Sequence, residues 1–240
     1  MKNFLKTTAL FLFIVLQARA QFMVINHPKG YAVIKDTYFK KAIDTIPNGY
    51  VVYAKESDVQ GMNIVFQETK QEPWQNFATI GYLSSDDALP IEAYSTLLPT
   101  AHLFGNTLVK ESGKTKVTIE QKPFDEQENK YEWRDGGDYK HPVINDRSYF
   151  GVTGKPTLQF AEITIRVGET ICTIPKQWMN DLYDPNLKKT SCYYEADKNR
   201  VYLICSLGLL RDYQLAKVIW VIENGKVKQR LLLSPAFEKP

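Results

Sequence analysis

The feature that most constrains the fold of this chain is the repeated interruption of short β-type runs by turn residues. Between Val24 and Ile91, short runs of aromatic and β-branched residues alternate with turn residues such as Pro28, Gly30, Gly61 and Gly81. Short runs bounded by turn residues favour strands. The pattern predicts a small β barrel over residues 21–91.

The clearest turn in this half is Ile-Pro-Asn-Gly at residues 46–49. Proline sets φ at the first central position of a turn, and Asn48 and Gly49 tolerate positive φ. We expect a tight reversal here, followed by a strand that begins near Tyr50.

Several short motifs of this region resemble the bacterial SH3 domain family. They are Gly30-Tyr31, residues 43–49 with their Ile-Pro-Asn-Gly ending, the expected strand 51–54, and residues 81–85 followed by Leu89. The resemblance covers under a third of the chain. It departs from the family after Gly-Tyr, where Ala32-Val33-Ile34-Lys35 replaces the usual Asn-x-Arg pair. It implies an SH3-like barrel acting as a non-catalytic adaptor, often attached to cell-wall-acting modules.

Four aromatic residues are the candidate ligand-binding residues: Tyr31, Tyr53, Trp74 and Tyr82. An SH3-like barrel would bring their segments together, and their rings can floor a groove for an extended peptide or a sugar-peptide strand. The alternative is that most of them form the core of the barrel. We expect Tyr31 and Trp74 to be the exposed pair.

The first 20 residues have the layout of a secretory signal peptide. Lys2 and Lys6 precede an apolar run at residues 9–16, and Ala18 and Ala20 supply the small residues of a cleavage site. We expect cleavage after Ala20 and a periplasmic or secreted product. No later run is long and apolar enough to cross a bilayer, so stable membrane insertion is not expected.

Charge argues against a nucleic-acid partner. Loss of Lys2, Lys6 and Arg19 with the signal peptide leaves 27 basic side chains against 27 acidic ones. A nucleic-acid binder normally carries a basic excess gathered on one face.

The rest of the chain is expected to form a second β domain. Residues 92–113 have the mixed composition of a linker, and residues 114–240 contain two expected strands, at 116–122 and 157–167. Pro175 favours the start of a short helix near 175–183. The fold class is therefore mostly β: an N-terminal SH3-like barrel, then an antiparallel β domain with one short helix.

One expected hairpin raises the question of a disulfide. A two-residue turn at Lys198 and Asn199 would place Cys192 opposite Cys205, within disulfide reach, and leave Cys172 free. The alternative is that these thiols are buried and reduced.

A second hairpin is centred on Asn224 and Gly225, the strongest short hairpin signal. One of its faces is expected to collect basic residues beside Ile219 and Val221, either as a solvated face or as a site for an anionic partner. The basic residues are Lys217, Lys226, Lys228 and Arg230.

No residues stand out as catalytic. A cysteine peptidase would place its cysteine early in the catalytic domain, whereas Cys205 lies late, in an apolar strand. The three histidines His27, His102 and His141 have no metal-ligand spacing. Asp135 and Asp138 fit a tight turn better than a calcium loop. We expect no enzymatic activity and no cofactor.

The function predicted from the sequence is therefore an exported binding protein for a cell-envelope peptide, glycan or protein. An inhibitor or immunity-type protein that blocks an envelope-directed enzyme or toxin is the first alternative. A cell-wall hydrolase is the second, since a pair of catalytic carboxylates is defined in space and not by sequence spacing.

Overall fold

The computed structural model describes residues 21–36, 38–56, 61–68, 78–93, 95–135, 140–152, 154–208 and 216–233. Within these residues the chain is mostly β, and its helical elements are 3-10 turns of three residues each. The prediction of a mostly-β fold is thereby confirmed. No helix in the described part of the chain is long and apolar enough to span a bilayer. The expected signal peptide and Trp74 lie outside the described residues.

The N-terminal part forms one seven-stranded sheet in the order β3-β2-β6-β5-β4-β1-β7. Its strands are β1 (Gln21–Ile25), β2 (Tyr31–Lys35), β3 (Ala42–Pro47), β4 (Val51–Glu56), β5 (Met62–Glu68), β6 (Ala78–Ser84) and β7 (Ala88–Pro90). The 3-10 turn η1 (Ser85–Asp87) precedes β7, which pairs with β1. The predicted reversal between β3 and β4 is present: the Tyr50 amide donates to the Pro47 carbonyl, and Gly49 has φ +84°.

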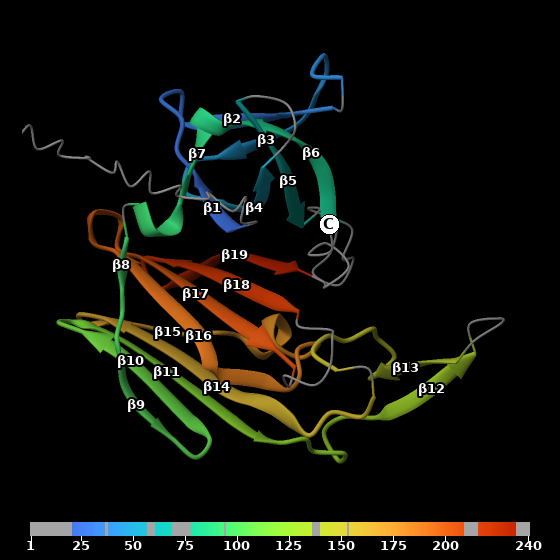
Figure 1. The fold of residues 1–240 in the computed structure, drawn as a ribbon. Coiled ribbons are helices and arrows are strands. Elements are labelled where there is room, and N and C mark those ends of the chain that lie inside the picture. Colours follow the sequence, from blue (N-terminus) through green and yellow to red (C-terminus); the bar gives the residue numbers. More distant parts are fainter. Residues whose placement is uncertain are drawn as a thin grey trace, which may run out of the picture.

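The remaining strands form two five-stranded sheets and one hairpin. The first sheet has the order β19-β18-β17-β16-β8 and the second β15-β14-β11-β10-β9. The hairpin β12-β13 extends to one side (Figure 1). The strands are β8 (Thr96–Leu97), β9 (Thr100–Phe104), β10 (Thr107–Ser112), β11 (Thr115–Pro123), β12 (Tyr131–Asp135), β13 (Lys140–Ile144), β14 (Leu158–Val167), β15 (Thr170–Thr173), β16 (Pro185–Glu195), β17 (Arg200–Leu207), β18 (Lys217–Glu223) and β19 (Lys226–Leu233).

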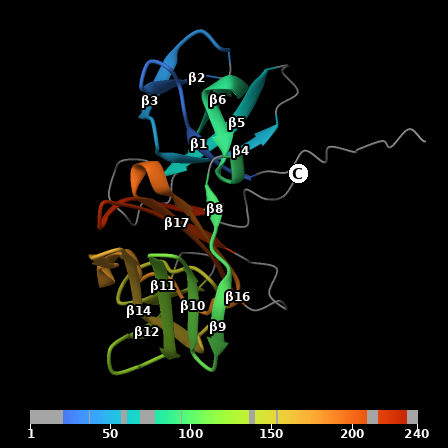
Figure 2. The same cartoon turned by 90° about the vertical axis from the view of Figure 1, so that its left-hand side faces the viewer.

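Residues 92–113 are not a free linker, contrary to the sequence prediction. β8 pairs with β16 at the edge of one sheet, and β9 and β10 form the edge of the other. Figure 2 shows β8 and β9 following one another down one side of the molecule. The buried side chain of Leu98 lies between these two strands and joins the core of the two sheets. Of the apolar residues of this segment, Leu98 and Leu108 are buried in that core, whereas Leu97, Leu103 and Phe104 are exposed.

The sheet containing β16 to β19 is buried on both faces and lies in the middle of the molecule (Figure 1). On β18, Val218, Trp220 and Ile222 pack against the second five-stranded sheet. Their neighbours Ile219 and Val221 pack against the N-terminal sheet. Successive side chains of a strand point to opposite faces, so a continuous apolar run produces a strand with two buried faces.

The contact between the N-terminal sheet and the central sheet is a packed core. Phe22 and Val24 of β1 meet Tyr202 and Leu231 there. The side chain of Gln229 accepts a hydrogen bond from the Val51 amide at 2.7 Å and donates one to the Val51 carbonyl at 2.8 Å. This interface fixes the N-terminal sheet on the rest of the protein. The interior of the N-terminal sheet is a separate core that includes Met23, Ile25, Ile34, Val52 and Leu83.

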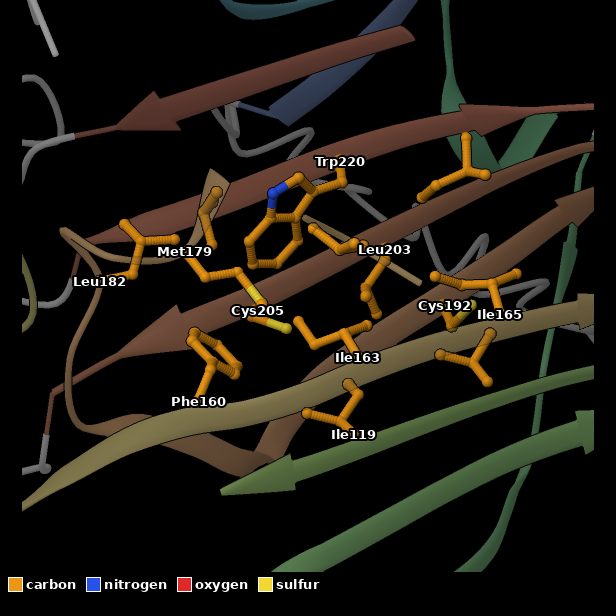
Figure 3. Packing of buried hydrophobic residues seen from close by; sticks show 14 of the residues in the cluster. Ile119, Phe160, Ile163, Ile165, Met179, Leu182, Cys192, Leu203, Cys205 and Trp220 are labelled. Atoms are coloured by element: carbon orange, nitrogen blue, oxygen red, sulfur yellow. The ribbon is translucent and has the colours of Figure 1, made fainter. Parts of the chain in front are cut away.

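Figure 3 shows the largest core, which lies between the two five-stranded sheets. Phe160 and Trp220 meet there edge to face, with ring centroids 5.8 Å apart. Phe160, Ile163 and Ile165 of β14 are buried in this core, with exposures of 8%, 0% and 2%.

A single 3-10 turn, η3 (Lys176–Trp178), replaces the helix predicted near 175–183. Met179 and Leu182 follow this turn, and their side chains lie in the core. Asp181 is held by Arg230 through its side chain and by the Phe150 amide through its carbonyl. A helix this short is marginal by itself, so these tertiary contacts decide the local conformation.

The Asn224–Gly225 turn is confirmed: Glu223 pairs with Lys226, and both turn residues have positive φ. The predicted basic face is wrong. A β-bulge between Val221 and Ile222 reverses the alternation along β19, so Arg230 points toward the core and pairs with Asp181. Most of the face expected to be solvated is buried, since Ile219 and Leu231 lie against the N-terminal sheet, whereas Lys226 and Lys228 near the turn are exposed.

The predicted disulfide is not formed. The turn between β16 and β17 contains the 3-10 turn η4 (Ala196–Lys198) and Asn199 with φ +49°, so it is two residues longer than expected. Cys192 consequently pairs with Leu203 rather than with Cys205. A shift of two residues keeps both cysteines on the core face, and all three cysteines are buried and free.

We expect three thiols in the unfolded protein and almost none accessible in the folded one. Burial raises the pKa of Cys205 to about 12, and it also raises the pKa of Cys172 and Cys192. At pH 8 the reactive thiolate form of Cys205 is therefore scarce in the folded protein. Thiol titration of the mature protein with and without guanidinium, in the absence of reductant, measures both numbers. A single titratable thiol in the unfolded protein would show that two of the three cysteines form a disulfide.

Candidate functional site

A pocket of about 170 Å³ lies on the outer face of β2, beside Tyr31. Ala32 and Ile34 of β2 point into the core of the N-terminal sheet, so Tyr31, Val33 and Lys35 point outward. These three outward residues line the pocket together with His27, Lys29, Ala32, Met62, Ser84 and Asp87. The volume lies below the range of roughly 300–1,000 Å³ for small-molecule sites. It suits one side chain or one terminal group of a larger ligand.

The 46–49 turn holds one wall of this pocket in place. Asn48 accepts a hydrogen bond from the His27 amide at 3.0 Å and donates one to the His27 carbonyl at 2.8 Å. The Lys29 amide donates to Nδ1 of His27 at 3.1 Å. In the neutral imidazole the proton then resides on Nε2, which lies 3.5 Å from Oδ1 of Asp87. The position and tautomer of His27 are therefore determined by its neighbours.

The pocket carries two ammonium groups, those of Lys29 and Lys35. Among the described residues, neither Lys29 nor Lys35 makes an ion pair, and Asp87 faces His27. Two such cations beside a half-exposed aromatic ring favour a ligand that presents a carboxylate next to an apolar surface.

The four aromatic residues predicted to bind ligand do not all lie on one surface of the protein. Tyr31 is 43% exposed and lines the pocket. Tyr82 lies opposite Lys35 in the pairing of β2 with β6, and its ring meets that of Phe39 with centroids 4.7 Å apart. Residues opposite each other in a sheet share a face, so Tyr31 and Tyr82 both lie on the outer face.

Tyr53 is buried, in agreement with the alternative that it belongs to a core. It is 3% exposed and packs edge to face on Phe22, in the core between the N-terminal sheet and the central sheet. It lies on the face of β4 that a free-standing barrel would expose, but here the central sheet covers that face. Trp74, the fourth predicted residue, lies outside the described residues.

Sequence reasoning missed the polar residues of the pocket. Alternation along β2 is a signal that would have placed Lys35 on the face of Tyr31. His27 and Asp87 lie 60 positions apart in the sequence, and only the pairing of β1 with β7 brings them together. No group of three His, Cys, Asp or Glu side chains in the described part of the chain is arranged to hold a metal ion.

No family model, curated protein or solved structure matches this chain. Its class is therefore defined by its own fold: a mostly-β protein built from several antiparallel sheets, with a polar and aromatic pocket on its N-terminal sheet.

Proposed function

We propose that this protein is an exported, non-catalytic binding protein whose N-terminal SH3-like unit recognises a cell-envelope peptide, either free or carried on a glycan. The peptide lies extended along the outer face of β2 and places a carboxylate-bearing group in the pocket beside Tyr31. The signal-peptide pattern of residues 1–20 supports the exported location.

The observation that carries this proposal is the combination of Tyr31 with Lys29 and Lys35 on one outward face. From Tyr31 to Lys35, β2 spans about 13 Å at the usual rise of a strand. The face continues through Tyr82 and Phe39. An extended peptide of a few residues matches this length, the rings accept its apolar parts, and the lysines attract its carboxylates.

The order of elements in the N-terminal sheet supports the SH3-like assignment. The hairpin β2-β3 is inserted between β1 and β4, strands β4 to β6 follow as a meander, and η1 leads to β7 beside β1. The resemblance to the bacterial SH3 family therefore rests on this layout together with the sequence motifs at Gly30-Tyr31 and residues 81–85. The β4 face that carries Tyr53 belongs to the contact with the central sheet, which leaves the outer face of β2 for ligand.

Replacement of Tyr31 by Ala is expected to weaken binding of the mature protein to purified peptidoglycan by about 10-fold, because an exposed aromatic anchor is lost. Co-sedimentation over a range of peptidoglycan concentrations measures this effect. Tyr38→Ala is the matched control, since Tyr38 is 76% exposed on the loop of the same hairpin and does not line the pocket. Equal binding by both variants and the wild type would refute the site.

The same incubation tests the two alternative functions. Release of soluble fragments would indicate a cell-wall hydrolase. Absence of both sedimentation and release would refute wall binding and leave an envelope protein as the partner, as expected of an inhibitor or immunity-type protein.

A further inference from the structure

A second cleft, of about 460 Å³, lies at the base of the β12-β13 hairpin. This volume is within the range of roughly 300–1,000 Å³ that is typical of small-molecule sites. Its residues come from the loops before β12 and after β13, from β11 and β14, and from the loop that begins with η3. It is separate from the pocket beside Tyr31 and shares no residue with it.

One wall of the cleft is a connected network of carboxamides. The side chain of Asn129 donates to Gln159 at 2.7 Å and accepts from Asn145 at 3.2 Å. The Tyr183 hydroxyl shares its one proton between the Asn180 carbonyl at 3.0 Å and Oδ1 of Asn129 at 3.2 Å. Gln159 continues the network to Glu128, which Lys122 holds at 2.8 Å. This ion pair lowers the pKa of Glu128, so the carboxylate stays charged.

The network holds its polar groups in place beside an apolar floor formed by Phe160, Ala161, Met179 and Leu182. Gln159 is only 6% exposed, and Tyr183 is 2% exposed. The Tyr183 ring is fixed edge to face by Phe124 and Tyr149, with centroids 5.5 Å and 5.8 Å away. A ligand that enters the cleft therefore meets oriented hydrogen-bonding groups and needs little rearrangement of the protein.

Two exposed groups of the cleft have no partner within the described residues. Lys176 makes no ion pair or side-chain hydrogen bond there, and the carboxamide of Asn180 makes no hydrogen bond. Both lie on the loop opposite the carboxamide network. The cleft thus offers the Lys176 ammonium, whose charge also acts on Glu128, together with the Asn180 carboxamide and a row of fixed amides.

We propose that this cleft binds a sugar residue that carries a carboxylate, such as a hexuronic acid. A hydroxyl group both donates and accepts, as a carboxamide does, so the Asn180 carboxamide and the remaining donor and acceptor of Asn145 match a polyol. The apolar floor accepts the faces of a sugar ring, and Lys176 pairs with the carboxylate. This site is independent of the peptide-binding face proposed for the N-terminal unit.

Isothermal titration of the mature protein with D-glucuronate, D-galacturonate, D-glucose and acetate tests the proposal. At least one uronate is expected to bind, D-glucose about 10-fold more weakly, and acetate not measurably. Lys176→Gln should lower the uronate affinity to that of glucose and leave glucose binding unchanged, because it removes only the charge contact. Lys176 is exposed, so this variant should fold normally.

Lys188→Gln is the matched control, since Lys188 is an exposed lysine that does not line the cleft. It should bind the uronate as the wild type does. Absence of uronate binding, equal binding of acetate, or full uronate affinity in Lys176→Gln would overturn the proposal. Tyr31→Ala should leave uronate binding intact, and Lys176→Gln should leave peptidoglycan sedimentation intact, so failure at one site is distinguishable from failure at the other.

Discussion

Replacement of Asp181 by Ala is expected to lower the free energy of unfolding by about 3–5 kcal/mol, because it leaves a buried guanidinium without its counter-ion. Both partners are almost fully buried, with side-chain exposures of 1% for Arg230 and 7% for Asp181. Their contact is bidentate, with Nη1 to Oδ1 at 2.9 Å and Nη2 to Oδ2 at 2.6 Å. An arginine cannot lose its proton to escape this penalty. Urea unfolding followed by circular dichroism measures the change.

The matched control is the double variant Asp181→Leu with Arg230→Met. It replaces both charges by apolar groups, and a substitution of this kind is often close to neutral. We expect the double variant to recover most of the stability lost in Asp181→Ala. A loss under about 1 kcal/mol in the single variant, or an equal loss in both, would show that the ion pair does not hold the η3 loop on β19.

Replacement of Trp220 by Ala is expected to lower the free energy of unfolding by about 3–5 kcal/mol, because it opens a cavity in the main core. Trp220 is 0% exposed, belongs to the core between the two five-stranded sheets, and meets Phe160 edge to face. Urea unfolding followed by far-ultraviolet circular dichroism measures this loss without using tryptophan fluorescence.

Trp220→Phe separates ring packing from the polar edge of the indole. Nε1 of Trp220 has no hydrogen-bond partner among the described residues, so the smaller ring gives up no such bond. We therefore expect Trp220→Phe to lose clearly less stability than Trp220→Ala. Equal losses in the two variants would mean that the edge-to-face contact with Phe160 contributes little.

Part of the candidate site was predictable from local sequence. The 46–49 turn was predicted from the φ preferences of Pro, Asn and Gly, and its Asn48 holds His27 at the pocket. Tyr31 was predicted to be exposed and is. The cations and Asp87 were not predicted, because strand pairing brings them together from distant segments. The residues of the carboxamide cleft were even less predictable from sequence. Asn129, Gln159 and Asn180 lie in three separate segments, and no sequence spacing relates them.

The sequence by itself determined several of the strands and two of the reversals, at residues 46–49 and 224–225. Alternation and turn chemistry act within a few residues, so β11, β14 and the Asn224–Gly225 hairpin were predictable. Tertiary structure decided which faces are buried: the central sheet covers Tyr53, and the N-terminal sheet covers the face of β18 and β19 that carries Ile219 and Leu231. It also decided the register of β16 with β17, which removed the disulfide. A longer turn or a bulge changes the local free energy little, so contacts made across the whole molecule select among such alternatives.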